Sequence, residues 1–166
     1  MRRLLLLGIG LLPVILFGFG NDALASENNG NDGEGGRSFT TTLKGTNEVP
    51  PATGSDLRGT AKVTINLGRH ILCWDLDYTT SQKVVAAHIH HGVAGVTAPV
   101  VFGFFNPPPS ATVVNDGCRQ GDPALLRDIA MHPGDYYVNV HTTIFPAGAG
   151  RGQLRRHGSD DQETDD

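Results

Sequence analysis

The chain has 166 residues, a formal net charge of −4 at pH 7, and 39% hydrophobic and 18% charged residues. Between Arg37 and Arg156, 11 lysine and arginine residues face 8 aspartate and glutamate residues, so the acidity belongs to the two ends. No basic run alternates with aromatic residues, which argues against a nucleic-acid partner.

The chain begins with the layout of a secretory signal peptide. Two arginines precede an apolar run over residues 4–19, and the small residues of "ALA" follow at 23–25. This order predicts a signal peptide over residues 1–25, with cleavage after Ala25. A transmembrane anchor is the less favoured alternative, because the run is short and interrupted by glycine and proline. We therefore expect a secreted or cell-envelope protein without stable membrane insertion after cleavage.

Two segments with almost no apolar side chains flank the remainder. Residues 26–37 (SENNGNDGEGGR) and 156–166 cannot bury enough surface to offset the entropy of ordering them. We expect a flexible leader and an acidic disordered tail around one domain over residues 38–155, which is long enough for one hydrophobic core.

Alternation of apolar and polar residues dominates this domain and predicts β-strands. The stretch 58–67 (RGTAKVTINL) alternates throughout, and "GR" at 68–69 predicts a tight turn into 70–78. Further short strands are predicted at 39–43, 99–104, 135–141 and 150–154. The sequence thus indicates an all-β fold, an antiparallel Greek-key β-sandwich or barrel.

Two segments depart from the strand pattern. In 122–134, Asp122 is a suitable N-cap, Pro123 suits the first helical position, and a Pro-Gly pair ends the run, so one short helix is predicted. "NEVPP" is predicted to be a loop, because its two prolines cannot donate to a sheet ladder. Its glutamate, Glu48, is expected to be a local hydrogen-bond acceptor rather than a catalytic acid.

The chain has two cysteines, Cys73 and Cys118. Cys73 shares a strand face with aspartates, and Cys118 lies in the segment "NDGCRQGD", which is expected to be irregular. In an exported protein a disulfide between them is favoured, and two unpaired thiols are the alternative.

Three of the seven histidines lie in the stretch "VVAAHIHHG". Val85, Ala87 and Ile89 are expected to face the core, so His88 and His90 should point outward together.

A further histidine, His141, is expected on the outer face of the strand at 135–141. If the two strands are neighbours, His88, His90 and His141 converge on one patch. Three imidazoles can hold copper or zinc. A merely solvated histidine face is the alternative, because outward strand positions are polar by default.

The motifs "LKGTNEVPP", "AAHIHHGVAGVTAPVV" and "YYVNVHTTIFPAGAGRGQL" closely resemble the three blocks of the CHRD domain, first defined in chordin. "LCWDLDY" and the segment from "NDGC" to the helix are similar to an exported bacterial subgroup with a cysteine pair. The resemblance covers residues 39–154. It implies a non-catalytic extracellular or cell-envelope binding module, whose partner is an unknown extracellular protein or a metal ion.

A more distant resemblance links the histidines to copper/zinc superoxide dismutases, Greek-key barrels that hold copper with an H-x-H strand and a later histidine. It implies a copper cofactor on His88, His90 and His141, with Arg151 nearby, and an alternative function as a dismutase-like redox enzyme. The chain departs from that family in two respects: it lacks the bridging histidine with the zinc-loop ligands, and its later loop is short.

Overall fold

The computed structural model describes residues 36–105 and 115–158. Within these residues nine strands form one sheet in which every pairing is antiparallel. The strands are β1 (Arg37–Lys44), β2 (Arg58–Asn66), β3 (Ile71–Thr79), β4 (Val84–His91), β5 (Val100–Phe105), β6 (Asp116–Gln120), β7 (Tyr136–Thr142), β8 (Gly150–Gln153) and β9 (Arg155–Arg156). The signal peptide predicted over 1–25 lies outside the described residues, as do most of the leader and most of the acidic tail.

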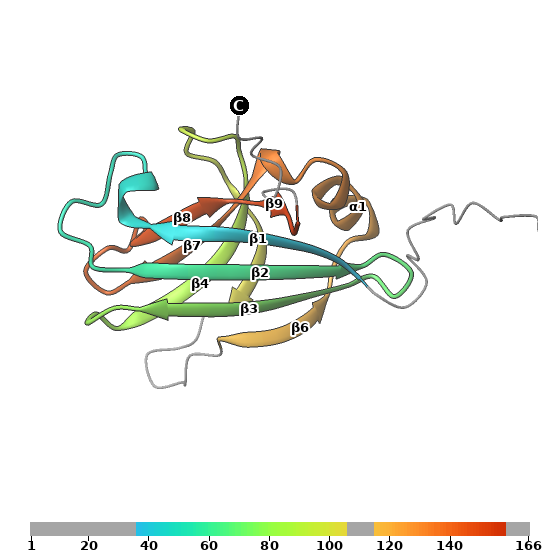
Figure 1. The fold of residues 1–166 in the computed structure, drawn as a ribbon, viewed down its shortest axis with the longest axis horizontal. Coiled ribbons are helices and arrows are strands. Elements are labelled where there is room, and N and C mark those ends of the chain that lie inside the picture. The colour runs from blue at the N-terminus through green and yellow to red at the C-terminus, as the bar shows by residue number, and fades with distance from the viewer. Residues whose placement is uncertain (1–35, 106–114, 159–166) are drawn as a thin grey trace, which may run out of the picture.

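The sheet curls into a nearly closed barrel (Figure 1). Its strand order is β5-β4-β7-β8-β1-β2-β3-β6, with β9 beside β1, so the links β3–β4 and β6–β7 cross between distant parts of the sheet. The two edges approach each other, since Trp74 stacks on Phe104 at 5.1 Å and Arg119 donates to the Gly103 carbonyl at 3.1 Å. The predicted all-β class is confirmed.

The hairpin of β2 and β3 follows the predicted alternation. Ala61, Val63 and Ile65 are at most 1% exposed and face the barrel interior, and Leu72 and Leu76 are buried with them. The polar residues between them remain partly or fully exposed. Burial of one face of each strand supplies the hydrophobic stabilisation of this half of the barrel.

The start of β4 differs from the prediction. Val84 is 6% exposed and belongs to the core, whereas Val85, expected inside, is half-buried and lies outside it. The register against β7 shifts between Val84 and Ala86, and such an irregularity reverses which residues face inward. Beyond the shift, Ala87 and Ile89 are fully buried as expected.

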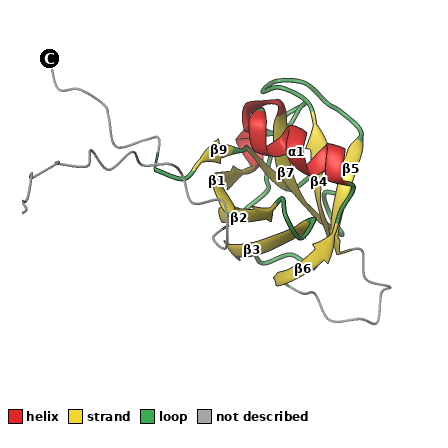
Figure 2. Cartoon of the chain, turned by 90° about the vertical axis from the view of Figure 1, so that its right-hand side faces the viewer, coloured by secondary structure: helices red, strands yellow, loops and turns green. Residues whose placement is uncertain are grey.

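The predicted helix is present as α1 (Pro123–Met131), at one end of the barrel (Figure 2). Asp122 is its N-cap and accepts a hydrogen bond from the Leu125 amide at 2.9 Å. Leu126 and Ile129 are buried against the core. No helix among residues 36–105 and 115–158 is long and apolar enough to cross a membrane.

The predicted disulfide between Cys73 and Cys118 is confirmed, with an S–S distance of 2.08 Å. The expectation that Cys118 lies in irregular chain is wrong, because it lies in β6, directly opposite Cys73 of β3. The sequence of β6, DGCRQ, shows no alternation of apolar and polar residues, and four of its five residues are exposed. The pattern therefore did not predict this strand. The backbone ladder and the disulfide hold it to β3.

Candidate metal centre

Two neighbouring strands, β4 and β7, carry the three predicted histidines. In their antiparallel register His88 lies opposite Asn139, and His90 lies opposite Tyr137. His141 is further along β7, beside His88, with ring centroids 5.0 Å apart. One potential ligand atom from each of His88, His90 and His141 lies within 4.8 Å of the other two. The structure therefore brings the three predicted residues together.

The histidines lie on the outer face of the sheet as expected, but the alternative of a merely solvated face does not fit their burial. His90 is 7% exposed and His141 is 8% exposed, while His88 is half-buried. The rings project from the outside of the barrel, but two loops fold over them. The Ala98 carbonyl in the β4–β5 loop lies 2.8 Å from His90 Nδ1, and the Pro146 carbonyl in the β7–β8 loop lies 3.0 Å from His141 Nδ1. The site is thus a covered cluster.

These carbonyl contacts fix the tautomers of two rings. A carbonyl can only accept, so Nδ1 of His90 and of His141 carries the hydrogen, and the lone pair of each neutral ring is on Nε2. Both Nε2 atoms are buried without a hydrogen-bond partner among the described residues, and so is Nδ1 of His88. A backbone carbonyl on one ring nitrogen and a free lone pair on the other is the arrangement of a metal-ligating histidine.

Burial lowers the pKa of all three histidines. For His88 the pKa falls to about 4, because of burial first and the neighbouring charges of His141 and His90 second. Burial also lowers the pKa of His90 and of His141. The rings are therefore neutral at pH 7, the form in which imidazole binds a metal. The donor set of three neutral imidazoles fits copper or zinc.

Arg151, predicted to lie near the histidines, is 4% exposed and linked to them through Tyr137. Its guanidinium lies 4.6 Å from the centroid of the Tyr137 ring, and that ring stacks on His90 at 4.8 Å. Arg151 Nε donates to the Asn47 carbonyl at 2.5 Å, and Nη1 donates to the Val96 carbonyl at 2.9 Å. The arginine thereby ties η1 (Gly45–Asn47) and the β4–β5 loop to β8.

Glu48 follows η1 in a loop, as predicted for "NEVPP", but its carboxyl group is buried, with 6% of the residue exposed. Asn139 Nδ2 donates to its Oε2 at 3.4 Å, so Glu48 accepts a hydrogen bond, but from a residue distant in the sequence and not locally as expected. Burial raises the Glu48 pKa to about 7, and the charge of Arg151 and the Asn139 hydrogen bond only partly oppose this rise. The loop prediction did not reveal this burial, because the residues that cover Glu48 are distant in sequence. Gly148 is one of them, and a Cβ there would lie 2.5 Å from the carboxylate.

The remaining histidines of the described residues lie elsewhere. His91 points away from the cluster and stacks on Tyr136 at 4.6 Å. His132 contacts Asp128 at 2.8 Å, and His70 lies in the β2–β3 turn with a φ of 54°.

The fold and the site define a disulfide-bonded antiparallel barrel with a covered histidine cluster on its outer surface. The family model of the CHRD domain matches residues 39–154, so the chain belongs to the CHRD domain family. No curated protein and no solved structure matches the chain. Neither of these two comparisons therefore supports the likeness to copper/zinc superoxide dismutases.

Proposed function

We propose that this protein is an exported, non-catalytic CHRD module that binds one copper ion through His88, His90 and His141. One observation carries the proposal: a ring nitrogen from each of the three histidines lies within 4.8 Å of the other two, and each ring has a buried nitrogen without a hydrogen-bond partner among the described residues. Buried polar atoms are normally satisfied, and a group of unsatisfied lone pairs facing one point is explained by a bound cation.

The donor set supports copper over other divalent ions. The cluster offers imidazole nitrogens and neither thiolate nor carboxylate, which disfavours calcium and magnesium. Among first-row divalent metals, nitrogen ligands bind copper most tightly, ahead of zinc. Zinc is the nearest competitor and serves as the comparison ion in the test below.

Export is supported by the predicted signal peptide and by the disulfide, since disulfides persist in oxidising compartments. Two loops cover the histidines, and this burial favours retention of an ion over turnover of a diffusing substrate. The dismutase-like alternative therefore receives no separate support from the geometry.

The test is metal analysis of the mature protein, purified without a histidine tag, followed by copper titration. We expect one copper per chain, bound more tightly than zinc. His88→Ala is the informative variant, because His88 is the most exposed of the three rings. Its copper affinity should fall at least about 100-fold, the upper range for loss of an outer-shell partner. His91→Ala, which removes an adjacent exposed histidine, is the matched control and should bind copper normally.

Superoxide turnover is measured on the same samples. Activity that rises in proportion to copper occupancy would replace the non-catalytic module with the redox enzyme. Absence of copper binding by the folded wild-type chain would overturn both functions.

A further inference from the structure

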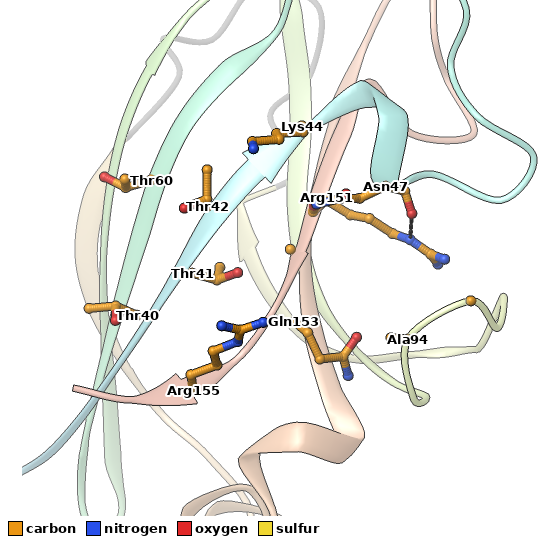
Figure 3. Close-up of a pocket in the computed structure, with 12 residues that line it drawn as sticks. Thr40, Thr41, Thr42, Lys44, Asn47, Thr60, Ala94, Arg151, Gln153 and Arg155 are labelled. Atoms are coloured by element: carbon orange, nitrogen blue, oxygen red, sulfur yellow. Dashed lines mark hydrogen bonds between the residues drawn. The ribbon is translucent and has the colours of Figure 1, made fainter. Parts of the chain in front are cut away.

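A second candidate site lies on the outer faces of β1, β2 and β8, and Arg151, which contacts Tyr137 near the histidine cluster, is part of it. It is a pocket of about 640 Å³, within the range of about 300–1,000 Å³ usual for small-molecule sites. Figure 3 shows threonine side chains of β1 and β2 on one side and the loop with Ala94 on the other, with Arg151, Gln153 and Arg155 of the neighbouring strands between them.

The pocket is lined by cationic side chains and by no acidic one. The cationic residues are Lys44, Arg151 and Arg155. Lys44 lies directly opposite Arg151 in the β1–β8 register, so two cationic side chains start from neighbouring backbone positions at the pocket. The two hydrogen bonds of Arg151 go to neutral carbonyls, and its Nη2 has no partner among the described residues. The Glu48 carboxyl group, which interacts with the charge of Arg151, does not line the pocket, and burial raises its pKa to about 7.

Apart from Ala94 and two glycines, the rest of the lining consists of neutral hydrogen-bonding side chains. Thr40, Thr42 and Thr60 supply hydroxyls, and Asn47 and Gln153 supply amide oxygens, since Asn47 Nδ2 already donates to the Arg151 carbonyl and Gln153 Nε2 to the Gly92 and Gly134 carbonyls. No aromatic or large aliphatic side chain lines the pocket, so it offers no subsite for an apolar ligand.

The sheet around the pocket leaves no place for an added peptide strand. β1 pairs along its length with β2, and on its other side with β8 at Lys44 and with β9 at Phe39 and Thr40. Between these positions Gly152 of β8 lies so close to β1 that a Cβ there would overlap the Thr42 carbonyl oxygen. Peptides that bind by strand addition need an open sheet edge and pockets for alternate side chains, and this surface has neither. A ligand must therefore be recognised by hydroxyl, amide and cationic side chains.

We infer that this pocket binds a sugar acid, a saccharide unit that carries a carboxylate. Arginine and lysine bind carboxylates through charge-assisted hydrogen bonds, and the threonine, asparagine and glutamine side chains match sugar hydroxyls. Lys44 and Arg155 take no part in the histidine cluster, so this site goes beyond the proposed copper binding and does not depend on it.

The test uses the full mature chain and trigalacturonate as the probe, with binding measured by calorimetry. Maltotriose is the neutral saccharide control, and triglutamate is the acidic peptide control. We expect trigalacturonate to bind more tightly than either control, with an affinity that falls at high salt. Lys44→Ala and Arg155→Ala should each weaken binding about tenfold, as expected for loss of a charged hydrogen bond. Both side chains are exposed, so the variants should keep the wild-type unfolding temperature.

Lys62→Ala is the charge-matched control, because Lys62 is an exposed lysine of β2 that does not line the pocket. It should bind trigalacturonate like the wild type. Equal binding of triglutamate, equal weakening by Lys62→Ala, or no binding of trigalacturonate would each overturn the proposal. The His88→Ala variant should bind the saccharide normally, which separates a failure of this proposal from a failure of copper binding.

Discussion

The strands β2 and β3 differ from β7 in how far their outer, polar faces are buried. On β2 and β3 one face lies in the core and the other, with Lys62 and Asp75, lies in solvent. On β7 all seven residues are buried, because loops cover the outer face as well. Polar residues on a doubly covered strand must find partners within the protein. Among the described residues, the buried side-chain atoms that lack one belong to Glu48, His88, His90, Asn139, His141 and Arg151.

The largest expected effect comes from truncating the covered outer face. Tyr137→Ala removes a side chain that is 2% exposed and packs against both His90 and Arg151. We expect a loss of about 3–5 kcal/mol in the free energy of unfolding, the range for large buried aromatic residues. Lys62→Ala on the solvent face of β2 should change it by less than about 0.5 kcal/mol. Urea denaturation measures both, and equal losses would refute the contrast between the two faces.

The next largest expected loss of stability comes from removing the disulfide between β3 and β6. Replacing both Cys73 and Cys118 by alanine opens a loop of 45 residues and should lower the free energy of unfolding by about 2–4 kcal/mol. The double variant is compared with the wild type in denaturant, with and without reductant. Thiol titration of the denatured, unreduced wild type should find no free cysteine, and the variant's stability should not respond to reductant.

A smaller effect is expected from the buried carboxyl group. The Glu48 pKa is about 7 in the folded protein and 4.5 as its ordinary value, so between these two values the folded state binds more protons than the unfolded state. The contribution of Glu48 to the free energy of unfolding is therefore fully present below pH 4.5 and is lost as the pH rises through about 7. Glu48→Gln removes that loss and should raise the free energy of unfolding at pH 8 by about 1–3 kcal/mol relative to the wild type.

The histidines have the opposite pH dependence, because their folded pKa values are lowered and stability falls as the pH drops below 6.5. The Glu48 contribution is thus read from the difference between wild type and Glu48→Gln at each pH. A difference that stays constant from pH 4.5 to pH 8 would contradict the raised pKa.

The smallest effect is the pH dependence of copper affinity. Three solvent-exposed histidines with ordinary pKa values would lose about 1,000-fold in affinity between pH 7.5 and pH 5.5 through proton competition. Because burial lowers the pKa of His88, His90 and His141, we expect a clearly smaller loss. Competition titrations with a chelator at the two pH values measure it, and the full loss would mean that the histidines are exposed in solution.

The sequence by itself determined the elements whose signals are local. Alternation over 58–67 and 70–78 predicted the hairpin, Asp122 and Pro123 predicted the start of α1, and two cysteines predicted the disulfide. The residues of the candidate site were also identified, since an H-x-H pair and His141 occupy outward positions of two strands. Each of these predictions depends on a few neighbouring residues and the period of one strand or helix.

Only the tertiary structure decided what covers the outer face. The contact between Arg151 and Asn47 joins residues 104 positions apart, and the one between Glu48 and Asn139 joins residues 91 apart. The shifted start of β4 and the exposed strand β6 likewise depend on their partner strands, not on their own pattern. Side-chain alternation shows that the two faces of a strand differ, but whether a loop lies over the polar face depends on long-range packing. Because of that packing, the histidines predicted on an outward-facing surface lie in a covered cluster.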